Sequence, residues 1–82
     1  MKIKKAELEK LIKVANKYWT TLSAGEEATN QFGKLWDTVE KLFKTKVGAM
    51  FDVILGTVRV KSDVTIEDIA NILEVLGYEV TE

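Results

Sequence analysis

The sequence predicts a small, mainly helical domain of the α+β class, with elements in the order helix, helix, helix, strand, helix, strand. Apolar residues make up 46% of the 82 residues, and most recur at steps of three and four, which is the spacing of one helix face. A β-branched segment that alternates with polar residues occurs only in the last third of the chain. Because this length is typical of one domain, we treat residues 1–82 as a single small domain.

A helical hairpin is predicted over residues 5–46. Its helices span 5–22 and 24–46, and each carries one apolar stripe. Between them, Ser23 and Glu26 match a capping box, in which two side chains satisfy backbone donors at a helix start. The short connection predicts antiparallel packing of the two helices. The stripes consist of Leu8, Leu11, Ile12, Ala15, Trp19 and Leu22, and of Ala28, Phe32, Leu35, Trp36, Val39, Leu42 and Phe43.

Residues 47–56 form an apolar segment that admits two interpretations. The helical spacing of its apolar residues extends the second helix, whereas Gly48 and the Lys-Thr-Lys before it indicate a bend. We predict a separate or kinked apolar helix that ends at Gly56. Because this helix is apolar on most sides, residues 47–55 belong either to the core or to an interface.

A short β-α-β unit is predicted over residues 57–81. Residues 57–60 are β-branched and alternate with polar residues, as strands do. A helix then starts with Thr65 and Asp68 as a capping box and ends before Gly77, and a second strand follows at 78–81. Because a two-stranded sheet is marginal alone, it must pack against the hairpin or against a second copy of the chain.

The same segment resembles a known unit. Gly56-Thr-Val-Arg-Val60, Thr65-Ile-Glu-Asp-Ile69 and Leu76-Gly-Tyr-Glu-Val80 are similar to the last β-α-β unit of heavy-metal-associated (copper chaperone-like) domains. The resemblance implies the local β-α-β arrangement only. No metal role carries over, because that family binds its metal through paired cysteines and this chain has no Cys.

Charge is spread unevenly along the chain, although the formal net charge is −1. Residues 1–46 hold ten Lys and six acidic residues, whereas residues 62–82 hold six acidic residues and no basic one. This pattern predicts that the two ends lie near one another, or meet head to tail in an oligomer. The alternative is a basic helix that binds an acidic partner.

The composition argues against catalysis and against metal or cofactor binding. The chain has no His and no Cys, so neither of its two Ser has a neighbouring His as base. Asp63, Glu67 and Asp68 lack the spacing and the glycine of a calcium loop. No glycine-rich loop precedes a helix to hold a phosphate. We predict a protein that is not an enzyme, with no catalytic residues, no metal site and no cofactor.

Protein binding is the function that remains. We expect a small non-catalytic protein-binding module that acts as a regulator or inhibitor; a viral (phage) or mobile-element inhibitor of a host defence protein is one form of such a module. We also expect a homo-oligomer, because so short a chain buries a small core. Met and aromatic side chains favour interfaces, with a core role as the alternative. The predicted interface residues are Tyr18, Phe32, Val47, Met50, Phe51 and Ile54.

A nucleic-acid-associated accessory protein is the alternative function, and it would use the Lys-rich face of the first helix. Nucleic acid is the less favoured partner. Residues 65–73 resemble the first helix of a helix-turn-helix unit, but the residues that follow are too few and too acidic to form a recognition helix. The apolar run 47–55 is too short to cross a bilayer, and no signal peptide is evident, so we expect a cytoplasmic protein without membrane contact. The lysines of the alternative contact are Lys2, Lys5, Lys10, Lys13 and Lys17.

Overall fold

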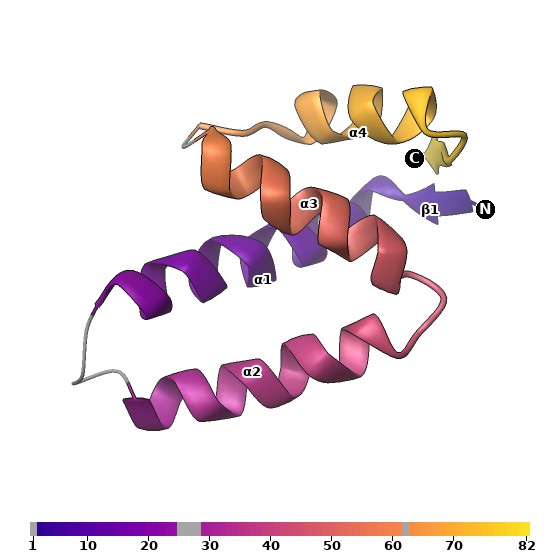
Figure 1. The fold of residues 1–82 in the computed structure, drawn as a ribbon. Coiled ribbons are helices and arrows are strands. Elements are labelled where there is room, and N and C mark those ends of the chain that lie inside the picture. The colour runs from indigo at the N-terminus through magenta and orange to yellow at the C-terminus, as the bar shows by residue number, and fades with distance from the viewer. Residues whose placement is uncertain (1, 25–28, 62) are drawn as a thin grey trace.

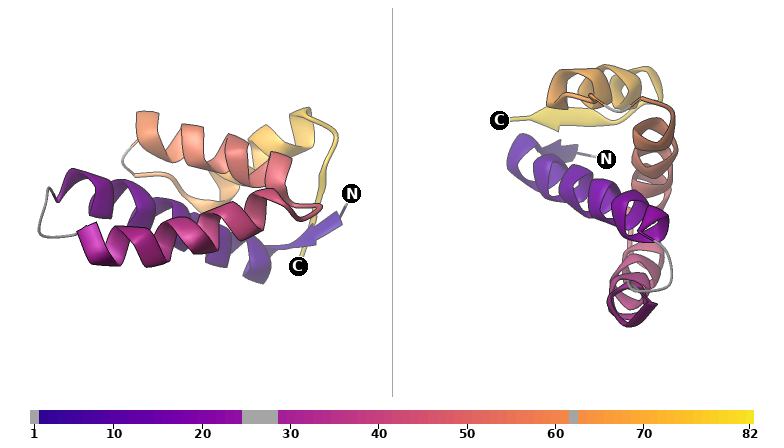
Figure 2. Two further views of the ribbon diagram at one scale, coloured as in Figure 1. Left: turned by 60° about the horizontal axis from the view of Figure 1, so that its bottom comes forward. Right: turned by 90° about the vertical axis from the view of Figure 1, so that its left-hand side faces the viewer.

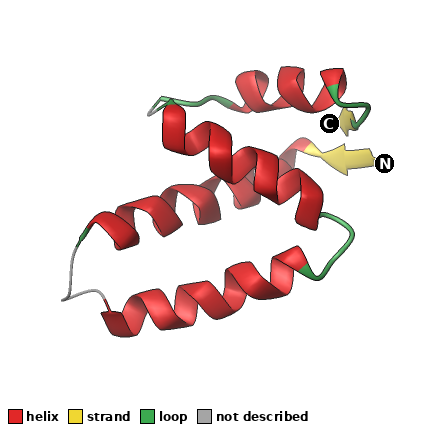
Figure 3. Cartoon of the chain, in the orientation of Figure 1, coloured by secondary structure: helices red, strands yellow, loops and turns green. Residues whose placement is uncertain are grey.

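The computed structural model describes residues 2–24, 29–61 and 63–82, and within them it has four helices and two short strands (Figure 1, Figure 3). The predicted mainly helical α+β class is confirmed, but the chain begins with a strand that the sequence did not predict. The elements in order are β1 (Lys2–Lys4), α1 (Lys5–Ser23), α2 (Thr29–Phe43), α3 (Gly48–Val60), α4 (Ile66–Val75) and β2 (Glu79–Thr81).

Helices α1 and α3 form the middle of the molecule and separate α2 from α4, as Figure 2 shows from two directions. Helices α1 and α2 run in opposite directions (Figure 1), so the predicted antiparallel hairpin is confirmed. Helix α4 packs against α1, α3 and β2. Helix α2 packs against α1 and α3 and is the outermost helix on its side.

The two ends of the chain are joined by a parallel pair of strands. Lys2 lies opposite Glu79, and Ile3 lies opposite Val80. The ammonium of Lys2 lies 3.8 Å from the Glu79 carboxylate, and that of Lys5 lies 3.9 Å from the Glu82 carboxylate. The predicted proximity of the basic start and the acidic end is thereby confirmed within one chain. Because exposed ion pairs stabilise little, the buried side chain of Ile3 is the stronger anchor of β1.

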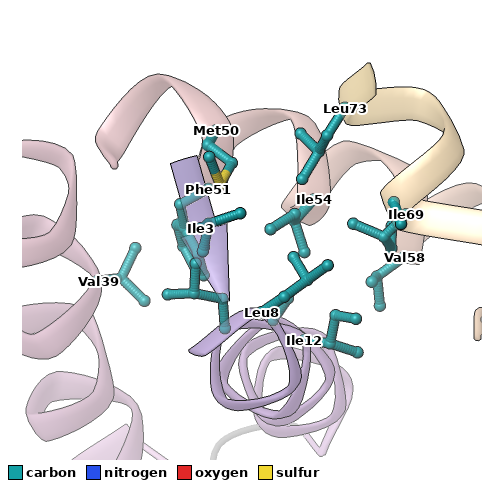
Figure 4. Packing of buried hydrophobic residues seen from close by; sticks show 13 residues of the cluster. Ile3, Leu8, Ile12, Val39, Met50, Phe51, Ile54, Val58, Ile69 and Leu73 are labelled. Atoms are coloured by element: carbon teal, nitrogen blue, oxygen red, sulfur yellow. The ribbon is translucent and has the colours of Figure 1, made fainter. Parts of the chain in front are cut away.

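One apolar core lies where α1, α3 and α4 meet. Figure 4 shows Leu8 and Ile12 of α1 pointing toward Ile54 and Val58 of α3. Every third or fourth residue of each helix reaches this core, which is the spacing that the sequence predicted. The buried apolar residues are Ile3, Leu8, Leu11, Ile12, Ala15, Leu35, Val39, Met50, Phe51, Ile54, Val58, Ile69, Ala70 and Leu73.

The predicted strand at 57–60 is wrong, because these residues are the last turn of α3. The hydroxyl of Thr57 donates to the backbone oxygen of Val53, four residues earlier, at 2.8 Å, as Thr side chains do within helices. Val58 is buried one turn after Ile54, so core packing outweighs the strand preference of β-branched residues. The predicted β-α-β unit at 57–81 is therefore absent, and the resemblance to heavy-metal-associated domains loses its basis.

The predicted limits of the last helix, α4, are confirmed. The Thr65 hydroxyl accepts from the backbone N–H of Asp68, and the Asp68 carboxylate accepts from the backbone N–H of Thr65, both at 3.2 Å. At the other end, Gly77 has a φ of +96°. The N–H of Tyr78 then donates to the oxygen of Leu73 at 2.9 Å, as in a Schellman motif. The predicted strand after it is β2.

Of the other predicted capping box, Ser23 lies within the described residues. Ser23 is the last residue of α1, and its hydroxyl donates to the backbone oxygen of Trp19 at 2.9 Å. Glu26, its predicted partner, and Ala28 of the predicted stripe lie outside the described residues. The described part of the second helix starts at Thr29 and ends at Phe43 rather than at 46.

The predicted bend at Gly48 is confirmed. A Cβ on Gly48 would lie 2.5 Å from the backbone oxygen of Phe43, so the chain can turn this tightly only at a glycine. The hydroxyl of Thr45 donates to the oxygen of Leu42 at 2.7 Å and closes the end of α2. As a result α3 packs directly on both helices of the hairpin. In the described segments, no helix has the length and apolar character needed to cross a bilayer.

Candidate protein-binding surface

Three of the predicted interface residues are core residues. Met50, Phe51 and Ile54 are 0% exposed and lie on the inner face of α3 (Figure 4). The ring of Phe51 packs against that of Phe43, with 5.6 Å between centroids. The interface prediction is wrong for these three, and the core alternative holds. Helical spacing alone did not separate the two, because α3 is apolar on most sides.

Val47 borders a hollow of about 310 Å³ between α1 and α2. It lies just before α3 and is half-buried. The floor of the hollow is apolar, and its rim carries Glu7, Lys10 and Thr38. The floor residues are Ile3, Leu11, Val14, Leu42 and Val47.

A second hollow of about 220 Å³ continues along the same pair of helices. Thr38 lines both hollows, so they adjoin one another, and we call the two together the α1–α2 groove. The second half of the groove is more polar than the first. Its lining residues are Lys17, Gln31, Lys34, Leu35 and Thr38.

Positive charge predominates along the α1–α2 groove. Lys10, Lys17 and Lys34 line it, against one acidic residue, Glu7. Among the residues that the structure describes, none of these lysines forms an ion pair with a carboxylate. The groove therefore combines an apolar floor with a basic rim.

Sequence reasoning missed this groove, although a signal for it exists. The groove residues of α1 are 7, 10, 11, 14 and 17, and those of α2 are 31, 34, 35, 38 and 42. Both series have helical spacing and run along one edge of an apolar stripe, with stripe residues such as Leu11 and Leu42 among them. Only the packing of the two helices shows that these edges face one another.

Tyr18 and Phe32, also predicted at the interface, lie together at the other end of the hairpin. Their ring centroids are 5.7 Å apart, and the ring of Trp36 stacks on Phe32 at 6.4 Å. Tyr18 and Phe32 are half-buried, whereas Trp36 is 42% exposed and Leu22 is 49% exposed. This aromatic cluster is the second apolar surface of the hairpin.

Trp19 has a structural role beside this cluster. Its indole N–H donates to the backbone oxygen of Leu55 at 2.8 Å. The guanidinium of Arg59 lies 5.2 Å from the ring centroid, a cation–π distance. Trp19 therefore fastens α1 to α3.

Three of the five lysines predicted for nucleic-acid contact have carboxylate neighbours. Lys2 and Lys5 lie beside Glu79 and Glu82, and Lys13 lies 3.7 Å from Glu9. Lys10 and Lys17 border the α1–α2 groove instead. The neighbouring carboxylates lower the positive potential that a phosphate backbone needs.

The shortest ion pair among the described residues belongs to the α4 cap. The Lys61 ammonium lies 2.9 Å from the Asp68 carboxylate. Their hydrogen bond lowers the pKa of Asp68 and raises the pKa of Lys61, and the Thr65 N–H lowers the pKa of Asp68 further. Across residues 2–24, 29–61 and 63–82, no group of three or more acidic residues is placed to hold a metal ion.

Comparison with known proteins gives no further guide to function. No protein-family model, curated protein or solved structure shows a significant match to this chain.

Proposed function

We propose that this chain is a small non-catalytic protein-binding module, a regulator or inhibitor that acts by protein–protein contact through the α1–α2 groove. The observation that carries the proposal is the groove itself, which lies between two antiparallel helices and has an apolar half and a more polar, Lys-lined half. Amphipathic segments of partner proteins bind grooves of this kind by burying an apolar face in them.

The burial of the floor supports a contact role. Val14, Leu42 and Val47 are half-buried, so a partner that covers them removes further apolar area from water. Val14 and Leu42 pack around the core rather than inside it. A partner can therefore bind without displacing any core side chain.

Site-specific photo-crosslinking in the source cell tests the proposal. A photoreactive phenylalanine analogue replaces Thr38, which is exposed in the middle of the groove, and in a control chain it replaces Asn71, which is exposed on α4. We expect a discrete protein adduct from position 38 and none of equal yield from position 71. Equal adducts at both positions, or none at 38, would contradict the groove as the contact surface.

Self-association is a further part of the proposal. The core is small, and Leu22, Trp36 and Phe43 remain exposed, so a second copy would bury apolar area that the single chain leaves open. Light scattering over a hundredfold range of concentration should show a mass above that of one chain. A mass of one chain at every concentration would contradict this part.

We propose a cytoplasmic protein, because a chain without Cys has no use for an oxidising compartment. Inhibition of a host defence protein by a viral or mobile-element product remains one form of the proposed role. Nucleic-acid contact is less favoured, because three of the five predicted lysines have carboxylate neighbours.

A further inference from the structure

We propose that the occupant of the α1–α2 groove is an acidic amphipathic helix of a partner protein. This inference rests on the proposed function and adds the chemistry of the partner. It is drawn from three properties of the groove, namely its length, the distribution of apolar surface along it, and the charge of its rim.

The length of the groove suits about three helical turns. On α1 it runs from Glu7 to Lys17, which corresponds to about 15 Å at a rise of about 1.5 Å per residue. A partner helix of this length presents three or four apolar side chains on one face, at spacings of three and four residues. A partner helix can lie along the seam between the antiparallel helices α1 and α2 and contact both of them.

The two halves of the groove differ in polarity, and this difference determines where apolar and acidic residues should lie along the partner helix. Near β1 and the α2–α3 turn, the floor is made by apolar side chains such as Leu11 and Leu42. At the other end, Lys17 of α1 and Lys34 of α2 line the same hollow, together with Gln31. The complementary helix carries its apolar anchors toward one end and its carboxylates toward the other.

Two other occupants fit these properties less well. A nucleic acid would pair with the lysines but would leave the apolar floor uncovered. The acidic helix α4 of a second copy presents Glu67, Asn71 and Glu74 outward, and the exposed apolar side chains there, Val75 and Leu76, lie at its last turn. It would therefore satisfy the charge of the groove but not its floor.

The test uses the full chain and four labelled helical peptides of 14 residues. The first has a Leu and Phe stripe and four Glu at one end. The second peptide has four Lys in place of the four Glu, and the third has four Gln there. The fourth peptide keeps the four Glu but has Gln in place of the apolar stripe. A DNA duplex is the fifth probe, and fluorescence anisotropy at low salt gives each Kd.

We expect the acidic amphipathic peptide to bind about tenfold or more tightly than the Gln peptide, and we expect the Lys peptide not to bind. The double variant Lys17→Glu/Lys34→Glu should weaken the acidic peptide by at least about tenfold, because two attractions become repulsions. Lys13→Glu, on the α1 surface outside the groove, is the matched control and should leave the Kd unchanged. Thr38→Glu should weaken binding, whereas Thr38→Lys should preserve it.

Several results would overturn the inference. Equal binding of the Lys or Gln peptide would remove the charge argument, and equal binding of the peptide without a stripe would remove the apolar one. Tighter binding of the DNA duplex, lost in the double variant, would assign the lysines to phosphates.

If no peptide binds but position 38 still gives a protein adduct, the acidic helix is wrong and the proposed function stands. If position 38 gives no adduct, the proposed function itself fails.

Discussion

The two ends of the α1–α2 hairpin are packed very differently. At the end near β1 and α3, Leu8 is fully buried and Gly48 touches the backbone of Phe43. At the opposite end, Leu22 is about half exposed, and a Cβ on Gly33 would meet nothing within 4 Å. We call these the packed end and the open end. The contrast indicates that stability is concentrated at the packed end, while the α1–α2 groove runs along the seam from the packed end toward the open end.

Two leucines on α1 should show the largest difference in stability between the packed end and the open end. Leu8→Ala should lower the free energy of unfolding by about 2–5 kcal/mol, because it leaves a cavity in the core. Leu22→Ala should lower it by about 1 kcal/mol or less, because half of that side chain is already in water. Urea unfolding followed by circular dichroism measures both. Equal losses would show that the open end is as well packed as the other.

Two glycines of the hairpin region should respond in opposite directions. Gly48→Ala should destabilise the chain by about 1–3 kcal/mol, because the new methyl group overlaps the Phe43 oxygen. Gly33→Ala should stabilise it by up to about 1 kcal/mol, because Ala favours a helix interior and space is free. Thermal unfolding of the two variants gives the signs. A stabilising Gly48→Ala would mean that the turn is looser than described.

The two capping signals in the sequence should differ in effect. Thr65→Ala should cost about 1 kcal/mol, because it removes the acceptor for the Asp68 N–H at the start of α4. Ser23→Ala should change stability by less than about 0.5 kcal/mol, because its hydroxyl donates to the oxygen of Trp19 at an exposed helix end. Chemical unfolding measures the difference. A larger loss for Ser23→Ala would show that this residue does cap a helix.

The smallest expected effect is the pH dependence of the α4 cap. The pKa of Asp68 is lower in the folded chain than in the unfolded one. Its contribution to stability is therefore present above the ordinary carboxyl pKa and is lost as pH falls through the folded value. The pKa of Lys61 is raised, so its contribution is present at neutral pH and is lost as pH rises through the folded value.

An NMR titration of the Asp68 carboxyl measures this effect. In the variant Lys61→Met the pKa of Asp68 should move back up toward its ordinary value, because the charged hydrogen bond is gone. The Thr65 N–H still donates to this carboxylate, so the return should be incomplete. An unchanged titration would show that Lys61 does not hold the carboxylate in solution.

Local signals explain which elements the sequence could predict. The Thr65 and Asp68 box and the Gly77 terminus set α4 through bonds within a few residues, so the pattern was sufficient. The strand at 57–60 failed because the burial of Val58 against α1 and α4 cannot be read from residues 57–60 alone. Strand β1 was missed because one apolar residue, Ile3, is too little alternation to recognise.

The candidate site was harder to predict than the fold. The sequence marked Val47, Tyr18 and Phe32 as available for contact, and all three are only half-buried. It could not separate Phe51 from them, because core and interface residues have the same composition. The α1–α2 groove arises from residues on two helices, and their alignment depends on the turn at Gly48 and on packing with α3.

The most direct test of the α1–α2 groove as a binding surface measures crosslinking and stability in the same variants. The photoreactive group is placed at Lys10, at the rim of the groove, in chains that also carry Thr38→Glu or Asn71→Glu. We predict that both variants unfold within about 0.5 kcal/mol of the parent chain, and that only Thr38→Glu loses the adduct. A folded Thr38→Glu chain that keeps its full adduct would contradict a binding role for the groove. A Thr38→Glu chain that unfolds would show that the seam belongs to the core.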